Sequence, residues 1–288
     1  MLTRINSMHG LGDNIYQRPF VKALAAQSDV IIDTSWPELY ADIPGVRFLK
    51  PSVPLRTQQK NYEQSDTRWV KDERPDRVVH FGYGQNLHVL NIPETMKQCT
   101  GISNPPDMDL PDFGESPVSA HKPIAFIRPV TERREWRNSA RNPKPEYISA
   151  TVGALRATHY IVSVADIEGD AEWLVDGDGG VHYADLRLEK GQLSMRQMLS
   201  LLQHSDMVVG GMGFILPASI AAKRNAIIIG GGQMGHNHIS RVTAPHLDTS
   251  RIHYAEPTNP CPCKDMRHDC DKTIEGFSEW LEECLTCI

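Results

Sequence analysis

The stretch MHGLGDNIYQRPF, residues 8–20, joins a strand-like start of the chain to a helical pattern through a glycine-bearing turn. In nucleotide-binding folds such a turn usually holds phosphate, because the helix N-terminus offers N–H groups and a partial positive charge. Here the turn carries a carboxylate, Asp13, which would repel phosphate. Two interpretations follow: Asp13 is the N-cap of the helix, or it is a general base at the mouth of a cleft.

Short apolar runs alternate with helical patterns along almost the whole chain. The strand-like runs fall at 1–6, 29–33, 46–49 and 77–81, and then at 124–128, 159–165, 180–186, 206–210 and 225–230. Between them lie patterns of helical spacing, such as Ile148, Val152 and Leu155 at i, i+4 and i+7. Strands separated by helices predict parallel sheets, so the expected fold class is α/β.

The stretch 101–122 is rich in Pro, Gly and Ser and has no hydrophobic period, which predicts a linker. In a chain of 288 residues this favours two domains. We expect a Rossmann-like domain over residues 1–115, a second one over 116–270 and a tail helix within 271–288. Parallel sheets in two such domains would face each other across a cleft, where ligands usually bind.

Composition narrows the classes of function. Hydrophobic residues make up 40% of the chain and charged residues 23%, as in ordinary globular proteins. The net charge of −6 disfavours a large surface for duplex nucleic acid. No apolar run approaches the length of a membrane span and the N-terminus lacks a signal-peptide pattern, so a cytoplasmic location is expected.

Five of the six cysteines lie near the C-terminus: Cys261, Cys263, Cys270, Cys284 and Cys287. Disulfides are disfavoured in the cytoplasm, so a structural zinc site is one interpretation. The spacing is poor for zinc ligands, however, and reduced cysteines that pack a C-terminal tail are the favoured alternative.

Two segments of the second half are candidates for phosphate binding. Residues 128–144 hold six basic side chains after a predicted strand, which suits a diphosphate, although a solvated loop would look the same. Residues 208–223 form a strand, a glycine turn and a small-residue helix, in which Gly211 and Gly213 would let N–H groups approach a ligand. Close packing of the helix on the sheet is the alternative there.

The segment GGGQMG, residues 230–235, matches the dinucleotide fingerprint after a strand, and Glu256 could bind a ribose. This supports a rival interpretation as a NAD(P)-dependent oxidoreductase. Against it, the following residues form a poor helix with Pro245 inside. The DGD sequence at 176–178 resembles a metal motif of some sugar transferases but is more simply a turn.

Taken together, these pieces resemble the heptosyltransferase-like glycosyltransferases, which have the GT-B fold, including compact phage-encoded members. The resemblance rests on the turn Gly10-Leu11-Gly12-Asp13 followed by Pro19, and on Thr131, Arg134 and Trp136 after the first strand of the second half. It covers most of the chain. The glycine turn before an alanine-rich helix and the cysteines of the tail follow in the order that the family shows.

The resemblance implies an inverting glycosyltransferase that needs no cofactor or metal and works in the cytoplasm of a bacterial or phage-infected cell. Asp13 would be the catalytic base. It would take a proton from the acceptor, a glycan, a lipopolysaccharide-type hydroxyl or a modified DNA base. The implied donor-binding residues for the nucleotide-diphosphate sugar are Arg128, Thr131, Arg134, Gly211, Met212, Gly213 and Phe214. The implied acceptor-side residues are His9, Gly12, Asn14 and Gln17.

Two departures from the family pattern concern the donor. The usual acidic residue of the second turn is replaced by Gly211 or Met212, and the usual histidine after it by Leu216. The identity of the sugar therefore does not carry over. A sugar-nucleotide-binding protein without turnover stays as a third interpretation.

Overall fold

The structure is a computed structural model of the chain, and it describes residues 1–83, 90–234, 237–262 and 270–287. The described chain divides into two compact units. Unit 1 comprises Met1–Asp112 together with Ser240–Leu247, and unit 2 comprises Phe113–Ile239 together with Asp248–Ile288. Ser240–Leu247 thus belongs to unit 1 although it follows most of unit 2 in the sequence.

Unit 1 is built on a four-stranded parallel sheet with the order β3-β2-β1-β4. Its strands are β1 (Leu2–Asn6), β2 (Asp29–Asp33), β3 (Val46–Leu49) and β4 (Arg77–His80). Three successive residues of β2, Val30, Ile31 and Ile32, are buried. A run of buried β-branched residues is what a strand covered on both faces requires.

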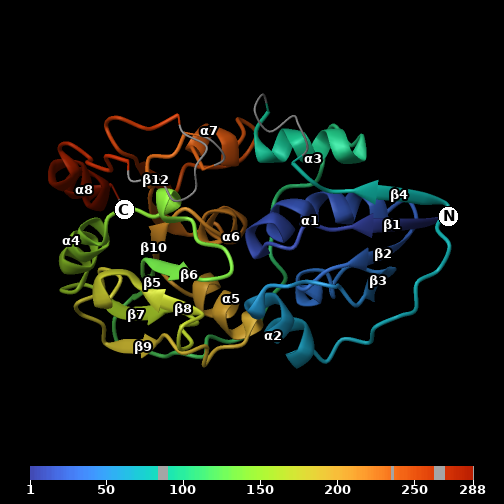
Figure 1. Cartoon of the computed structure of the whole chain (residues 1–288), viewed down its shortest axis with the longest axis horizontal. Helices are drawn as coiled ribbons and strands as arrows, with labels where there is room; N and C mark the ends of the chain where they lie inside the picture. The colour runs from blue at the N-terminus through green and yellow to red at the C-terminus, as the bar shows by residue number, and fades with distance from the viewer. Residues whose placement is uncertain (84–89, 235–236, 263–269, 288) are drawn as a thin grey trace. The chain divides into compact units, whose positions relative to one another are not determined.

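The helices of unit 1 are α1 (Leu11–Ala25), α2 (Arg56–Gln64) and α3 (Ile92–Thr100), with the short turn η1 (Pro37–Leu39). Helix α1 joins β1 to β2 and lies alongside the sheet with α3 beside it (Figure 1). Its apolar residues Ile15, Phe20 and Leu24 are buried in the core of the unit. The short helix α7 (Ile239–Val242) begins at the boundary of the two units.

Unit 2 contains a six-stranded parallel sheet with the order β12-β11-β10-β5-β7-β9. Its strands are β5 (Ile124–Arg128), β7 (Tyr160–Val164), β9 (Leu186–Leu188), β10 (Met207–Gly211), β11 (Asn225–Ile229) and β12 (Ile252–Ala255). Its helices are α4 (Pro145–Leu155), α5 (Met195–Gln203), α6 (Ile215–Ala222) and α8 (Phe277–Thr286). The predicted α/β class with parallel sheets is confirmed in both units. No helix in the described residues is both long and apolar enough to cross a membrane.

One predicted strand is displaced. The run 180–186 was expected to be extended, but the strand there is β9, Leu186–Leu188. Gly180 has a φ of +85° and lies against the carbonyl of Pro145, so the chain turns where the sequence pattern suggested a strand. A two-stranded antiparallel sheet, β6 (Thr131–Arg133) with β8 (Glu172–Leu174), was not predicted, because three-residue strands show no usable period.

The predicted linker, residues 101–122, contains no helix or strand. It is nonetheless attached at both ends. In unit 1 the fully buried Arg18 of α1 pairs with Asp109 at 3.0 Å. In unit 2 the hydroxyl of Ser200 on α5 donates to the carbonyls of Gly114 and Glu115.

Candidate functional site

The turn between β1 and α1 has its carbonyl groups held by side chains. The Nδ2 of Asn14 donates to the Met8 carbonyl at 2.6 Å and to the Gly10 carbonyl at 2.9 Å. The indole Nε1 of Trp36 donates to the His9 carbonyl at 2.8 Å. Three successive carbonyls are thus satisfied by two side chains, which fixes the backbone that precedes the helix.

Asn14 and Gln17, expected on the acceptor side, lie beneath this turn and are fully buried. The Oδ1 of Asn14 accepts from the hydroxyl of Thr34, and the Oε1 of Gln17 accepts from that of Ser7. These two side chains support the turn from beneath. They do not contact an acceptor directly, because their polar atoms face the interior. Of the other two expected residues, His9 is exposed and Gly12 is half-buried.

Asp13 is the third residue of α1, and the N-cap is Gly10, which makes no side-chain cap. The interpretation of Asp13 as the N-cap is therefore wrong, because the helix begins three residues earlier than that role needs. Its Oδ1 accepts a hydrogen bond from the hydroxyl of Tyr83, which follows β4. The carboxylate is half-buried and lies in the first turn, where the helix dipole favours a negative charge.

Further titratable groups stand at the same edge of the unit 1 sheet. Asp33 ends β2, and its carboxylate accepts from the Ser7 N–H at 2.6 Å. Burial raises the pKa of Asp33, while the Ser7 N–H and the nearby His9 and His80 partly offset that rise. Asp33 and His80 were not predicted as site residues. Asp33 ends a predicted parallel strand and His80 is the last residue but one of another, and the carboxyl ends of such strands share one edge.

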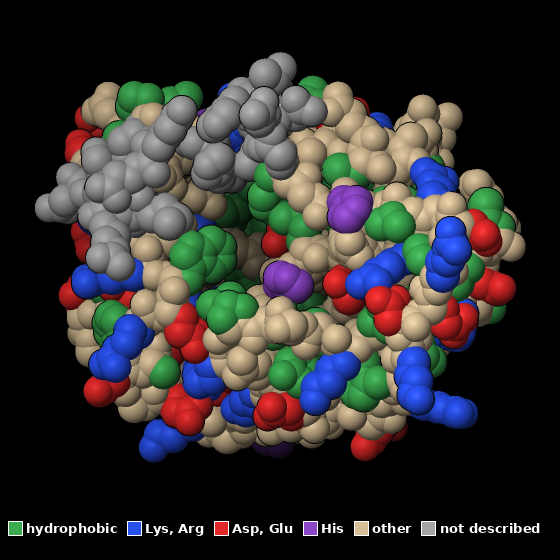
Figure 2. Space-filling model, turned by 45° about the vertical axis from the view of Figure 1, so that its right-hand side comes forward, with side chains coloured by type: hydrophobic (Ala, Val, Ile, Leu, Met, Phe, Trp, Pro, Cys, Tyr) green, Lys and Arg blue, Asp and Glu red, His purple; other side chains and the backbone are tan. Residues whose placement is uncertain are grey.

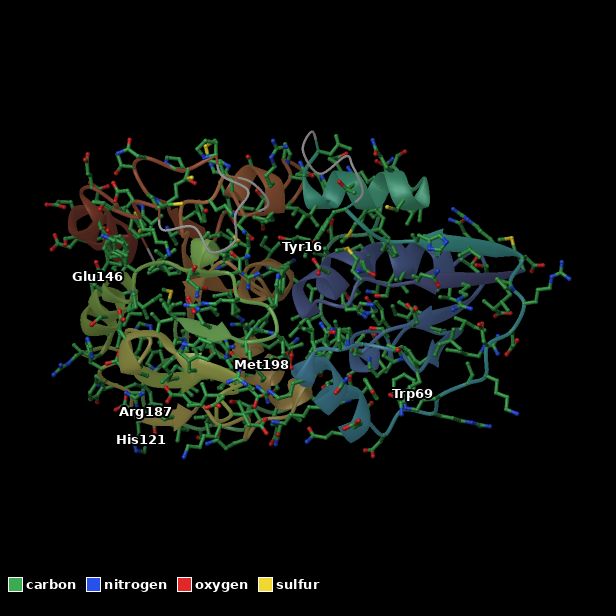
Figure 3. All side chains as sticks on the ribbon, viewed as in Figure 1. Tyr16, Trp69, His121, Glu146, Arg187 and Met198 are labelled. Atoms are coloured by element: carbon green, nitrogen blue, oxygen red, sulfur yellow. The ribbon has the colours of Figure 1, made fainter. Side chains whose placement is uncertain are left out.

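Tyr16 lies one turn after Asp13 on α1 (Figure 3). Its hydroxyl donates to the carbonyl of Val242 at 2.5 Å, which ties the segment 240–247 to this helix within unit 1. Burial raises the pKa of Tyr16 strongly, and the charge of Asp13 adds to the rise. Tyr16 is therefore a neutral hydrogen-bond donor in this arrangement.

In unit 2, Arg128 and Thr131 both serve a buried carboxylate. The Nη2 of Arg128 and the hydroxyl of Thr131 donate to Oε1 of Glu172, at 3.0 Å and 2.9 Å. Arg128 also donates to the carbonyl of Val164 at 2.9 Å. Burial lowers the pKa of Arg128, and the charge of Glu172 works against that shift. These contacts connect β5 and β6 to β8, so both predicted donor-binding residues have roles inside the unit.

Arg134, the second arginine among the expected donor-binding residues, is on the surface. Its side chain is 70% exposed and pairs at 3.1 Å with Asp170, which is 85% exposed. Contacts of this kind between mobile surface chains hold neither partner firmly. The exposed pair with Asp170 thus gives no support for Arg134 as a residue of the glycine turn.

Arg141 is the basic residue next to the turn that precedes α6. Its Nη2 is 3.6 Å from the position of a Cβ at Gly213, and its guanidinium lies 5.6 Å from the ring centre of Trp136. Arg141 belongs to the basic segment 128–144 but was not among the expected donor-binding residues. Six cations within residues 128–144 gave no signal to single it out.

Two glycines allow the backbone around Arg141 to reach the sheet. A Cβ at Gly231 would be 2.4 Å from the carbonyl carbon of Arg141, and one at Gly211 would be 2.8 Å from Cδ of Pro143. Any side chain at Gly231 would therefore collide with backbone and displace the segment. The segment around η3 (Ser139–Arg141) therefore packs closely against the carboxyl ends of β10 and β11.

The turn Gly211–Phe214 leads directly into α6, whose N-cap Phe214 makes no side-chain cap. Uncapped N–H groups at a helix N-terminus, with an arginine beside them, form a suitable environment for an anion. Met212 is buried, with 7% of its surface exposed, and so offers its backbone rather than its side chain. Leu216, which stands where the family has a histidine, is fully buried and apolar.

The GGGQMG segment has a packing explanation, as far as its described residues go. A Cβ at Gly230 would be 2.6 Å from the hydroxyl of Tyr254, and Gly232 has a φ of +85° beside Pro257. Gly235 lies outside the described residues. The next described helix is α7, of four residues, whereas a dinucleotide fingerprint opens a full helix. Glu256 pairs with Nε2 of His238 at 3.1 Å.

The DGD segment and the cysteines near the C-terminus are the remaining candidates for metal binding. At 176–178, Asp176 and Gly177 have φ values of 54° and 86°, as the predicted turn requires. Cys284 is buried on α8, and burial raises the pKa of its thiol, while Cys263 lies outside the described residues. Among described residues there is no group of three or more His, Cys, Asp or Glu side chains that could hold a metal ion.

Figure 2 shows one face of the molecule, on which Lys and Arg side chains alternate with Asp and Glu. No broad field of one sign covers this face.

Comparisons with known proteins bear on the fold. Neither a family model nor a curated protein matches the chain. Among solved structures, the glycosyltransferase TibC of enterotoxigenic E. coli H10407, described as dodecameric and iron-containing, matches 100% of this chain and 72% of its own, with 12% identity and a TM-score of 0.59. E. coli ADP-heptose LPS heptosyltransferase II matches over 100% of this chain and 99% of its own, with 12% identity and a TM-score of 0.58.

The chain has the heptosyltransferase fold. A third structure, E. coli WaaC with ADP-2-deoxy-2-fluoro heptose, matches 89% of this chain and 93% of its own, with 13% identity and a TM-score of 0.53. The resemblance drawn from the glycine turns is thus confirmed at the level of fold. At this identity the likeness says nothing about which sugar or acceptor is used.

Proposed function

We propose that the chain is an inverting glycosyltransferase that moves a sugar from a nucleotide-diphosphate donor to an acceptor hydroxyl. The observation that carries the proposal is Asp13, a half-buried carboxylate on the first turn of α1, in a turn held by Asn14 and Trp36. A general base has to be fixed in orientation, and this turn provides that. The heptosyltransferase fold supports the same function.

In the proposed reaction Asp13 takes the proton of the acceptor hydroxyl as its oxygen attacks the anomeric carbon. A bond forms between that oxygen and the anomeric carbon, and the bond from the anomeric carbon to the diphosphate breaks. The electron pair leaves with the nucleoside diphosphate. Attack opposite to the leaving group inverts the anomeric centre, as in single-displacement sugar transfer.

Unit 2 would bind the donor in this proposal. The diphosphate gains negative charge as it leaves, and Arg141 with the N–H groups at the start of α6 could stabilise that charge. Arg128 and Thr131 would support the site indirectly through Glu172. The acceptor would bind at the edge of the unit 1 sheet, where the exposed side chain of His9 could contact it.

A thermal-shift screen tests the donor class. The ligands are ADP-heptose, which is bound in a TibC structure, other nucleotide sugars, free nucleoside diphosphates, NAD and NADP. A ligand at about 100 times its Kd should raise Tm by about 5–10 °C. Stabilisation by NAD or NADP alone would contradict the proposal and favour an oxidoreductase.

Turnover separates an enzyme from a binding protein. Each stabilising nucleotide sugar is incubated with the chain, and release of nucleoside diphosphate is followed with and without candidate glycan or nucleoside acceptors. The anomeric configuration of the product, read by NMR, tests inversion. Tight donor binding with neither hydrolysis nor transfer would indicate a sugar-nucleotide-binding protein instead.

A further inference from the structure

We propose that Glu172 is a positioning residue for Arg141, the arginine beside the glycine turn that precedes α6. Thr131 and Asn142 connect the two residues by hydrogen bonds. The inference rests on the proposed function for the part that Arg141 plays toward the donor. The connection itself lies within unit 2 and can be measured without any donor.

Glu172 is held at a fixed position in the interior of unit 2. It begins strand β8, and 2% of its side chain is exposed. Its Oε1 accepts from Arg128 at 3.0 Å and from the hydroxyl of Thr131 at 2.9 Å. Separating a buried carboxylate from its arginine partner is strongly unfavourable, because a charge is then left in the interior without compensation. Glu172 is therefore a firmly placed acceptor for the Thr131 hydroxyl.

Thr131 connects Glu172 to the basic segment. It is the first residue of β6, which pairs with the strand that Glu172 begins. Its hydroxyl donates to Glu172, while its carbonyl accepts from Nδ2 of Asn142 at 2.8 Å. Because both groups belong to one residue, loss of the hydroxyl contact also loosens the carbonyl to which Asn142 is attached.

The segment that carries Arg141 ends at Asn142. The Arg141 N–H donates to Oδ1 of Asn138 at 3.2 Å, and the Asn142 N–H donates to the Ser139 carbonyl at 3.1 Å. Gly231 lets this segment pack on the sheet, and the bond from Asn142 to the Thr131 carbonyl holds its end. A group that binds a ligand contributes fully only when its backbone keeps its place. The hydrogen bonds from Glu172 outward therefore act on the position of the Arg141 guanidinium.

Unit 2 contains a second buried carboxylate with partners of the same kinds. Oε1 of Glu189 accepts from the hydroxyl of Ser163 at 2.5 Å and from Arg187 at 2.9 Å. Ser163 lies within β7, and Glu189 directly follows β9, so this contact joins two neighbouring strands of the large sheet. Loss of the Ser163 hydroxyl is therefore the matched control for loss of the Thr131 hydroxyl.

The experiments break the connection at Thr131, not at Glu172. Replacing Glu172 would leave the guanidinium of Arg128 without its carboxylate partner, and the fold could be lost with it. Thr131→Val removes the hydroxyl and keeps both the shape of the side chain and the pair of Glu172 with Arg128. Thr131→Ser keeps the hydroxyl and should restore the behaviour of wild type.

The first experiment measures amide hydrogen exchange by NMR in the full chain without a donor. In Thr131→Val the amides of Arg141 and Asn142 should exchange about fivefold faster, because their segment loses part of the free energy that the bond to Glu172 supplies. Thr131→Ser and Ser163→Ala should leave these two amides at the rates of wild type. Unchanged rates in Thr131→Val, or equal rates in Thr131→Val and Thr131→Ser, would overturn the proposal.

The second experiment is a double-mutant cycle on the binding of ADP, measured by calorimetry. ADP is the nucleoside diphosphate part of the ADP-heptose in a TibC structure. Thr131→Val should weaken ADP binding about fivefold in the wild-type background and less than about twofold in Arg141→Ala, because a residue that acts through Arg141 loses its effect with it. An equal loss in both backgrounds would make Thr131 a direct phosphate contact and would overturn the proposal.

Asn142→Ala breaks the other half of the connection, while the Thr131 hydroxyl still donates to Glu172. It should speed exchange of the Arg141 amide and weaken ADP binding to the same extent as Thr131→Val. If wild type does not bind ADP, the proposed donor role of Arg141 fails for ADP, while the exchange rates still decide the connection. If Arg141→Ala weakens ADP binding but Thr131→Val and Asn142→Ala do not, the donor role stands and the positioning role of Glu172 is overturned.

Discussion

The turns that precede α1 and α6 differ in how they are held and in what they present. The first is fixed by side chains, since Asn14 and Trp36 donate to three successive carbonyls. The second is fixed by close backbone contact, since Gly231 and Gly211 let the segment around Arg141 reach the sheet. The first turn presents a carboxylate and the second presents N–H groups and an arginine. The same strand–turn–helix geometry can therefore serve a base or an anion site, according to its side chains.

The largest expected effect is that of Asp13→Asn on transfer. The amide cannot take the proton of an acceptor, so kcat should fall by about 10²–10⁴-fold. The fold should be kept, because Gly10 and not Asp13 is the N-cap, and the amide oxygen can still accept from Tyr83. Single-turnover transfer is measured beside melting temperature and donor affinity.

A near-normal rate in Asp13→Asn with donor affinity kept would remove the base role. Asp33 would then be the next candidate, because burial already raises the pKa of this carboxyl at the same edge of the sheet. Asp33→Asn is the matched variant for that outcome, although it also alters the contact with the Ser7 N–H.

The second effect in size is expected for Arg141→Ala. Loss of a charged hydrogen-bond donor should weaken binding of the nucleoside diphosphate by about 1.5–3 kcal/mol, roughly tenfold to a hundredfold. Arg141→Lys should recover only part of this, because a lysine cannot form the planar fork. Calorimetry with the diphosphate identified by the screen measures both variants. Unchanged affinity in Arg141→Ala would make the glycine turn before α6 a packing feature.

The third effect concerns stability and tests whether Asn14 holds the turn before α1. Asn14→Ala removes the buried side-chain amide that donates to the Met8 and Gly10 carbonyls, which should cost about 3 kcal/mol of unfolding free energy. Asn142→Ala is the control, because the Nδ2 of Asn142 donates to one carbonyl, that of Thr131, at 2.8 Å. It should cost about 1 kcal/mol.

Denaturant unfolding followed by tryptophan fluorescence compares the two asparagine variants. A cost in Asn14→Ala no larger than that in Asn142→Ala would mean that water replaces the amide under the turn. The first turn would then be held mainly by Trp36 through the His9 carbonyl.

The sequence predicted those features that depend on local pattern. The strands at 29–33, 46–49 and 124–128 match the structure, because short apolar runs between helical patterns are typical of the strands of a parallel sheet. The residues of the site were harder to predict. Whether Asn14 faces an acceptor or the interior depends on Thr34 and Trp36, which a sequence reading does not place beside it.

The donor-binding arginine could not be predicted from the sequence for the same reason. Arg134 and Arg141 are equivalent in a sequence, since both are cations in one basic segment. The structure separates them through Gly213 and Gly231, which come from other parts of the chain and admit the segment of Arg141 alone. Tyr83 was missed for a related reason, because its partner Asp13 is 70 positions away. Contacts across such separations are decided by strand order, not by local spacing.

The smallest effect is expected at Arg134, and it sharpens the comparison of the two turns. Its guanidinium is 70% exposed and its partner Asp170 is 85% exposed, so the pair is worth little and is screened by salt. Arg134→Ala should therefore change diphosphate affinity by less than about 1 kcal/mol, and less still at high ionic strength. The measurement is calorimetry at two salt concentrations, beside Arg141→Ala. A tenfold loss in Arg134→Ala at both concentrations would instead move the phosphate site to the exposed loop. The turn before α6 would then bind the donor without an arginine of its own, and only its N–H groups would distinguish it from the turn that carries Asp13.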